Sequence, residues 1–140
     1  MELSMNREAL GAFLVRDFGQ VAADFAVERV DEAGLCLRLA VAERHLRPGG
    51  TVSGPAMFAL ADVAVYLAIL SRIGPVALAV TTGCSMDFLR KPAAGRDVLA
   101  EVRLLKLGRS LAVGDVLLFS EGVADPVARG TFTYSLPPKG

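Results

Sequence analysis

Cysteine is scarce in this chain. The 140 residues contain two cysteines, Cys36 and Cys84, which are far apart and form no Cys-x-x-Cys pair. This spacing excludes a disulfide framework and a cysteine-based metal site. Both cysteines lie in apolar segments typical of strands, so we expect two buried free thiols in a reducing compartment.

A net charge is also lacking, because fifteen basic residues balance fifteen acidic ones. No overall field therefore attracts nucleic acid or an anionic membrane surface. The first ten residues have no uninterrupted apolar core of the kind found in signal peptides, and we expect a cytoplasmic protein. The apolar run at 53–71 is shorter than the roughly 20 residues of a membrane span and has an acid at its centre.

The motifs of nucleotide, metal and serine enzymes are missing from the sequence. It has no P-loop, no dinucleotide-binding glycine pattern, no serine-hydrolase elbow and no cluster of metal-ligating residues. We therefore expect neither a metal nor a bound cofactor. The single histidine, His45, lies ahead of a glycine loop, where a lone histidine is more often a surface residue than a catalytic one.

Apolar residues are abundant and make up 53% of the chain. A length of 140 residues is enough for one domain with a substantial core, which we place at residues 1–140. The apolar fraction is high for a small soluble monomer, which indicates that some apolar surface is buried between subunits.

The stretch from Ser53 to Ser71 predicts the central helix of the fold. Ser53 is a favourable N-cap, Pro55 suits the first helical turn, and no further breaker follows until Gly74. The segment is apolar on every side, so we expect it to be buried on every side.

Asp62 is the one charge within this helix, and no charged residue stands three or four positions away. A buried carboxylate is costly unless it is paired or hydrogen-bonded, so its partner must come from elsewhere. Asp62 is then either a structural carboxylate paired with Arg47 or Arg72, or a catalytic base or nucleophile at the wall of a cavity.

The remaining segments predict a second helix and an antiparallel sheet. Residues 5–18 form a short amphipathic helix. Strand-like alternation occurs in a hairpin at 21–43 and in segments 76–90, 97–107, 111–120 and 127–136. Gly83 allows a bulge, and tight turns suggest that the last four strands are antiparallel neighbours. Because only the apolar helix can cover the sheet, we predict an α+β fold in which a curved antiparallel sheet wraps around a long central helix.

A spaced motif runs through the helix start. Its positions are Arg47, Gly50, Ser53-Gly54-Pro55 and Asp62, followed by Thr81, Phe88-Leu89-Arg90-Lys91-Pro92 and the turn Leu107-Gly108-Arg109-Ser110. Segment 47–92 resembles the PaaI-like acyl-CoA thioesterases of the phenylacetic acid type, and the order of elements resembles the hotdog fold. In that family an Asn stands where Arg47 lies here, and His-Gly-Gly stands where Ser53-Gly54-Pro55 lies.

The resemblance implies that the backbone amide of Gly54 binds an oxyanion and that Asp62 is the catalytic carboxylate. Free amides at a helix N-terminus favour negative charge, and glycine lets a carbonyl oxygen approach closely. Eight residues of helix span about 12 Å, whereas reacting atoms must lie about 3–3.5 Å apart. Gly54 and Asp62 of one chain therefore cannot serve the same thioester, and we expect a homodimer that shares its sites across a two-fold axis.

Other candidate residues have open roles. Thr81 either holds Asp62 or a water, or merely suits a strand. Arg47 is a solvated loop residue, a partner of Asp62 or a substrate contact. Tyr66 lines the acyl pocket or belongs to the ordinary core. Arg90, Lys91 and Arg109 are either solvated charges at a strand edge or turn, or contacts to the phosphates of coenzyme A. Gly50 and Ser53 in the loop are the remaining expected substrate contacts.

The leading hypothesis is therefore an acyl-CoA thioesterase for small or medium acyl or aryl groups, assembled as a dimer or a dimer of dimers. The second hypothesis is a non-catalytic module that binds acyl-CoA or an acyl carrier protein, because the family Asn and His are replaced. A hotdog dehydratase is a third, weaker hypothesis, since His45 lies outside the helix and its immediate N-terminus.

Overall fold

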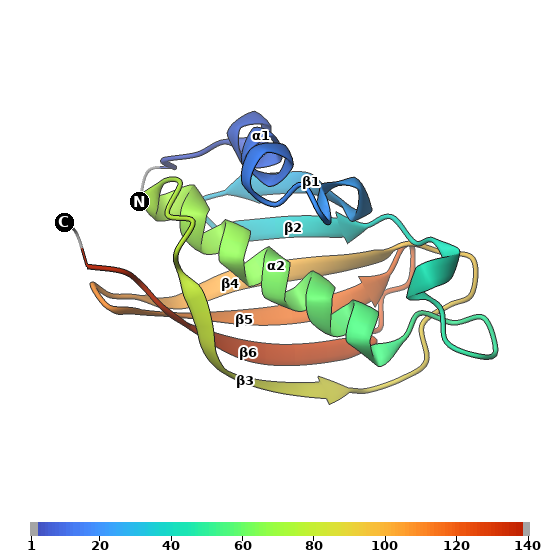
Figure 1. Cartoon of the computed structure of the whole chain (residues 1–140). Coiled ribbons are helices and arrows are strands. Elements are labelled where there is room, and N and C mark those ends of the chain that lie inside the picture. The colour runs from blue at the N-terminus through green and yellow to red at the C-terminus, as the bar shows by residue number, and fades with distance from the viewer. Residues whose placement is uncertain (1–2, 139–140) are drawn as a thin grey trace.

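Six antiparallel strands form one curved sheet around a long helix in the computed structural model, which describes residues 3–138 (Figure 1). The helices are α1 (Arg7–Asp17) and α2 (Gly54–Ile73), with short 3₁₀ turns at Ala22–Asp24 and Glu43–His45. The strands are β1 (Phe25–Asp31), β2 (Gly34–Leu39), β3 (Val80–Phe88), β4 (Val98–Leu107), β5 (Leu111–Ser120) and β6 (Ala128–Ser135). The predicted hotdog architecture is confirmed.

The strand order is β1-β2-β4-β5-β6-β3. The prediction that the last four strands are successive neighbours is right for β4, β5 and β6 and wrong for β3, which pairs with β6. The amides of Leu89 and Arg90 continue this pairing by donating to the carbonyl oxygen of Val127 (2.8 and 3.3 Å). The chain then crosses to β4 through a loop instead of a hairpin. β3 is consequently an edge strand with one side unpaired in the described chain.

Local signals determine both ends of α2. The Ser53 hydroxyl caps the helix by accepting a hydrogen bond from the amide of Ala56 (3.2 Å), and Gly74 ends it with a φ of 94°. Gly49 and Gly50 have φ values of 105° and 85° in the preceding loop, a backbone conformation that glycine adopts readily. The predicted start of α2 at Ser53 and its predicted end at Gly74 are confirmed.

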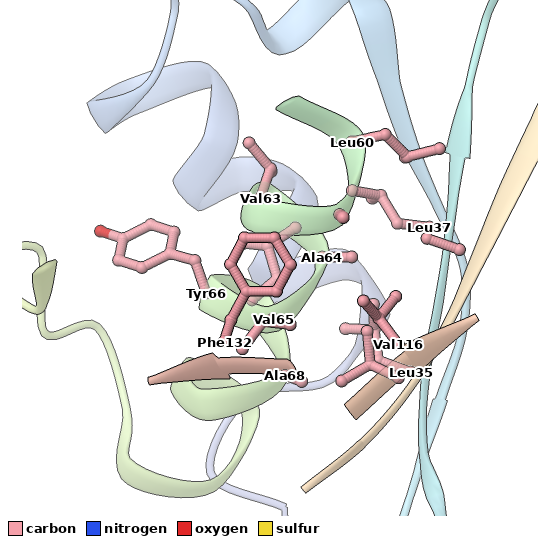
Figure 2. Packing of buried hydrophobic residues seen from close by; sticks show 14 of the residues in the cluster. Leu35, Leu37, Leu60, Val63, Ala64, Val65, Tyr66, Ala68, Val116 and Phe132 are labelled. Carbon is pink, nitrogen blue, oxygen red and sulfur yellow. The ribbon is translucent and has the colours of Figure 1, made fainter. Parts of the chain in front are cut away.

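The core lies between α2 and the concave face of the sheet. In Figure 2, Leu60 and Ala64 of α2 lie towards Leu37 of β2, with Leu35 and Val116 close by. All five side chains are buried, and each of the larger ones contributes about 1.5–3 kcal/mol relative to exposure. This packing fixes the rotation of α2 and therefore the direction in which Asp62 points.

One stripe of α2 is not buried. Pro55, Phe58 and Ala59 are exposed and Asp62 is partly exposed. These positions follow the helical spacing i, i+3, i+4 and i+7, so they share one face. The expectation of burial on every side is wrong for this stripe within one chain. The helix is long and apolar enough to cross a membrane, but 67% of its most apolar window is buried inside the protein.

The cysteines differ in exposure. Cys36 is buried in β2, where loss of hydration raises the pKa of its thiol to about 12. Cys84 is exposed because it lies on the edge strand β3, so the expectation of a buried thiol is wrong there. Both are free thiols, as predicted.

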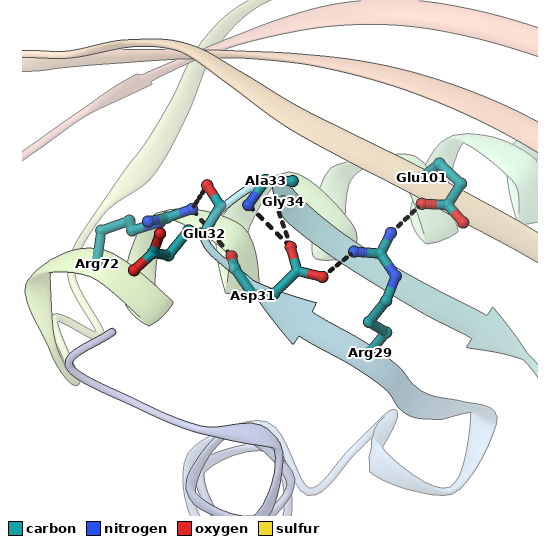
Figure 3. Close-up of polar contacts among 7 residues, drawn as sticks. All are labelled: Arg29, Asp31, Glu32, Ala33, Gly34, Arg72 and Glu101. Carbon is teal, nitrogen blue, oxygen red and sulfur yellow. Dashed lines mark hydrogen bonds and ion pairs between the residues drawn. The ribbon is translucent and has the colours of Figure 1, made fainter. Parts of the chain in front are cut away.

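The far end of α2 is tied to the β1–β2 turn (Figure 3). The Arg72 guanidinium donates to the carbonyl oxygens of Asp31 (3.0 Å) and Glu32 (2.5 Å). The Asp31 carboxylate is itself held by Arg29, which also contacts Glu101. Arg72 thus serves to dock the C-terminal end of the helix.

Candidate active site

The Asp62 carboxylate accepts two hydrogen bonds on a single oxygen. The Thr81 hydroxyl donates to Oδ1 at 2.6 Å, and the Tyr134 hydroxyl lies 2.7 Å from the same atom. Among residues 3–138, no arginine, lysine or histidine forms an ion pair with Asp62. The interpretation of Asp62 as a structural ion-pair partner of Arg47 or Arg72 is therefore wrong.

Strand register brings the two hydroxyls together. Thr81 of β3 stands directly opposite Tyr134 of β6, and the register shifts between Thr81 and Gly83. The extra residue at this point forms a bulge, a feature that often redirects a side chain beside a functional site. The predicted bulge near Gly83 is confirmed, and the side chain of Thr81 meets α2 at Asp62.

Asp62 lies at the boundary between two cavities. One, of about 370 Å³, is lined by Asp62, Tyr66, Thr81 and Tyr134 together with apolar side chains such as Val63. The other, of about 280 Å³, is bordered by Asp62, His45 and the exposed part of α2 around Phe58. The described chain gives the second carboxylate oxygen, Oδ2, no hydrogen-bond donor. The carboxylate is therefore anchored on one side and open on the other.

Tyr66 is buried, and it also lines a cavity next to Asp62. Its ring lines the 370 Å³ cavity and stacks on Tyr134 with centroids 5.9 Å apart. Its hydroxyl donates to the carbonyl oxygen of Ala77 (3.0 Å), and burial raises the pKa of the phenol. Tyr66 is thus a core residue that also forms the cavity wall beside Asp62.

Tyr134 is a site residue that sequence reasoning missed. Burial raises the pKa of its phenol well above the usual range, and the negative charge of Asp62 raises it further. Tyr134 therefore remains a hydrogen-bond donor throughout the neutral pH range. The available signal was alternation in β6, where Phe132 and Tyr134 both point inwards, but it does not indicate which inward residue meets Asp62.

Gly54 presents an open backbone amide at the N-terminus of α2. Its neighbour Pro55 has no N–H, and Ser53 is already used to cap Ala56. In the part of the chain that the structure describes, the Gly54 N–H has no acceptor. The helix dipole and this free donor both favour a developing negative charge.

Basic side chains gather around Gly54. A cavity of about 290 Å³ is lined by Gly54 together with Arg47, Phe88, Arg90 and Lys91. Three of the cations predicted to contact substrate are thus brought to one place, and Gly50 belongs to the loop beside them. The fourth cation lies apart: Arg109 is exposed in the β4–β5 turn, towards the C-terminal end of α2 (Figure 1).

The acid and the amide of one chain lie in separate cavities. Asp62 does not line the cavity at Gly54, and Gly54 lines neither cavity at Asp62. Eight residues of α2 separate them, or about 12 Å along the axis. The described chain therefore does not bring the Asp62 carboxylate and the Gly54 amide into one cavity.

His45 is buried, so its interpretation as a surface residue is wrong. Its Nδ1 accepts the amide of Ala42 (2.8 Å), its Nε2 lies 3.4 Å from Asp24 Oδ2, and its carbonyl accepts the Ser53 amide (2.8 Å). Burial and the nearby positive charge of Arg44 lower the pKa of His45. Since both ring nitrogens are engaged, His45 supports the loop before α2 and offers little to a dehydratase reaction.

Comparison with known proteins defines the family. Residues 49–127 match the family model described as the thioesterase superfamily, and the chain belongs to this superfamily. No curated protein sequence matches the chain. Among residues 3–138, no group of three or more His, Cys, Asp or Glu side chains could hold a metal ion.

Three solved structures show the range of the similarity. A protein from Silicibacter sp. TM1040, provisionally described as a thioesterase, is 58% identical, with 99% of this chain and 96% of that one covered and a TM-score of 0.93. A variant of the phenylacetic acid degradation protein PaaI from Thermus thermophilus is 32% identical, with 85% and 99% covered and a TM-score of 0.72. A hypothetical thioesterase from Streptococcus pneumoniae, solved with coenzyme A, is 20% identical, with 89% and 98% covered and a TM-score of 0.75, which shows the fold alone. The predicted PaaI-like relationship is confirmed.

Proposed function

We propose that this protein is an acyl-CoA thioesterase for small or medium acyl or aryl groups, and that Asp62 is its catalytic carboxylate. The observation that carries the proposal is the state of Asp62. Oδ1 accepts hydrogen bonds from the hydroxyls of Thr81 and Tyr134, whereas Oδ2 has no donor in residues 3–138. The carboxylate borders two cavities. A carboxylate held in this way is available to accept a proton or to attack a carbon.

When Asp62 acts as a base, it takes a proton from water as the water oxygen attacks the thioester carbon. The carbonyl oxygen becomes an oxyanion and accepts a hydrogen bond from a Gly54 amide. The C–S bond then breaks, and the departing thiolate takes the proton back from Asp62. If Asp62 instead attacks the carbon directly, water later cleaves the resulting anhydride, and the same amide serves both routes.

The surface of α2 supports a dimeric site. The exposed stripe of Pro55, Phe58, Ala59 and Asp62 is largely apolar and contains the proposed catalytic residue. An apolar face of this kind favours burial against another subunit. The edge strand β3 adds unpaired backbone groups and a 55% exposed Val80 next to that face.

Pairing of two β3 edges explains how such a dimer completes its sites. Thr81, near the start of β3, holds Asp62, whereas Phe88, at the end of β3, lies against Gly54. In an antiparallel pair around a two-fold axis, the start of one strand lies beside the end of the other. This arrangement brings Gly54 of the partner subunit towards Asp62, and each dimer then has two shared sites.

The basic cavity at Gly54 supports recognition of coenzyme A. The side chains of Arg47 and Lys91 are exposed and have no hydrogen-bond or ion-pair partner within residues 3–138, so both are available to phosphate groups. Arg90 also lines this cavity, although its guanidinium already donates to the carbonyl oxygen of Pro126. With its phosphates bound by these cations, coenzyme A would place the thioester near the Gly54 amide, which lines the same cavity.

A panel of acyl-CoA and aryl-CoA thioesters tests this proposal by release of free thiol. We expect turnover of at least one small or medium substrate, and we expect the rate to be unchanged by a metal chelator. Binding of acyl-CoA without any thiol release would instead support the non-catalytic module. The observation that favours that alternative is the presence of Arg47 and Ser53 at the positions of the family Asn and His.

A further inference from the structure

We propose that Tyr134 is a positioning residue that acts with Thr81 to select Oδ2 of Asp62 as the reacting oxygen. The inference deepens the proposed function and rests on Asp62 being the catalytic carboxylate. It concerns a hydroxyl on β6, and no spaced motif in the sequence points to it.

The selection follows from the asymmetry of the carboxylate. Free rotation about the terminal bond of an aspartate exchanges two equivalent oxygens. Here the hydroxyls of Thr81 (2.6 Å) and Tyr134 (2.7 Å) converge on Oδ1, so rotation would break two charge-assisted hydrogen bonds. Oδ2 then keeps its lone pairs free for a water proton or a thioester carbon.

Tyr134 is itself held firmly enough to act as a fixed donor. The residue is 3% exposed, and its ring stacks on Tyr66 with an interplanar angle of 23°. Its hydroxyl also lies 3.0 Å from the main-chain carbonyl oxygen of Asp62. A tyrosine ring has two torsions, and both are restricted here by packing, so the hydroxyl position is set by the fold.

The two hydroxyls have different exposure. Thr81 is partly exposed on the edge strand, whereas Tyr134 is buried on β6, an internal strand. The Tyr134 bond is therefore shielded from competition with water, and the fixed orientation of Asp62 depends on it most. Removal of the Tyr134 hydroxyl should free the carboxylate to rotate without altering the surrounding core.

The variant Tyr134→Phe tests the inference, because it removes the hydroxyl and keeps the ring. We expect kcat to fall about 10- to 100-fold, as for loss of a hydrogen bond to a charged group, with little change in KM. Thr133→Val, which removes a hydroxyl from the other face of the same strand, should match wild type in both kcat and KM.

A second readout separates this inference from the proposed function. With ¹³C-labelled aspartate and Asp62→Asn for assignment, the Asp62 carboxyl signal can be observed at one fixed neutral pH whether or not the protein is active. We expect its chemical shift to change in Tyr134→Phe, because a hydrogen bond to Oδ1 is lost, and to keep the wild-type value in Thr133→Val. An unchanged chemical shift in Tyr134→Phe overturns the positioning role, as does wild-type kcat in that variant. Absence of turnover in the wild type overturns the thioesterase proposal, whereas the carboxyl signal still tests whether Tyr134 holds Asp62.

Discussion

Asp62→Asn is expected to lower kcat for thioester hydrolysis by about 10²–10⁴-fold and to leave the fold intact. Asparagine has nearly the same shape as aspartate, and its amide oxygen can still accept hydrogen bonds from Thr81 and Tyr134. The variant nevertheless lacks an oxygen that can accept a proton or attack a carbon. The substitution should therefore lower kcat without lowering the thermal stability of the protein.

The measurement is free-thiol release from acyl-CoA at saturating substrate, together with thermal unfolding of the same samples. Asp125→Asn is a matched control, because Asp125 is exposed in the β5–β6 loop and lines none of the cavities around Asp62 and Gly54. It should retain wild-type kcat. Hydrolysis by Asp62→Asn at the wild-type rate would show that Asp62 is not the catalytic group.

Gly54→Pro is expected to lower kcat by about 10²–10³-fold, the usual effect of losing one oxyanion donor. Proline removes the amide N–H and is favourable at the first helical position. Ser53 already has the extended conformation (φ −76°, ψ 157°) that a following proline requires. Because this amide has no acceptor in residues 3–138, the substitution breaks no internal hydrogen bond there.

Gly54→Ala is the matched control for the amide. It keeps the N–H, and its added Cβ would lie 3.5 Å from the Phe88 ring, which is ordinary van der Waals contact. The alanine variant should lose much less of kcat than the proline variant when both are compared in the thiol-release assay. Equal activity of the two variants would contradict the role of Gly54 as oxyanion donor.

Local features of the fold were predictable because neighbouring residues encode them. Ser53 and Gly74 marked the ends of α2, and alternation marked the strands. The pairing of β3 with β6 was missed, since no local signal specifies which distant strand becomes a neighbour. The exposure of Cys84 depends on the edge position of β3 and was missed with it. The burial of His45 depends on contacts with Ala42, Asp24 and Ser53, which an isolated loop histidine does not reveal.

The candidate site was predictable in part for the same reason. The absence of a local charge partner correctly indicated that Asp62 depends on residues elsewhere in the fold. Thr81 was identified through the family resemblance, but Tyr134 was not, because its position opposite Thr81 is a property of strand register. The exposed stripe of α2 was not predicted from the sequence, because an apolar helix segment does not indicate whether its own chain or another subunit covers it.

The proposal that two subunits share each site is tested most directly by a mixed dimer of Asp62→Asn and Gly54→Pro subunits, purified through two different affinity tags. Neither variant alone should hydrolyse acyl-CoA appreciably. A mixed dimer has one site that combines an intact Asp62 with an intact Gly54 from the other chain, so we predict about half of the wild-type activity per dimer. A mixed dimer as inactive as its parents would contradict sharing of the site between subunits.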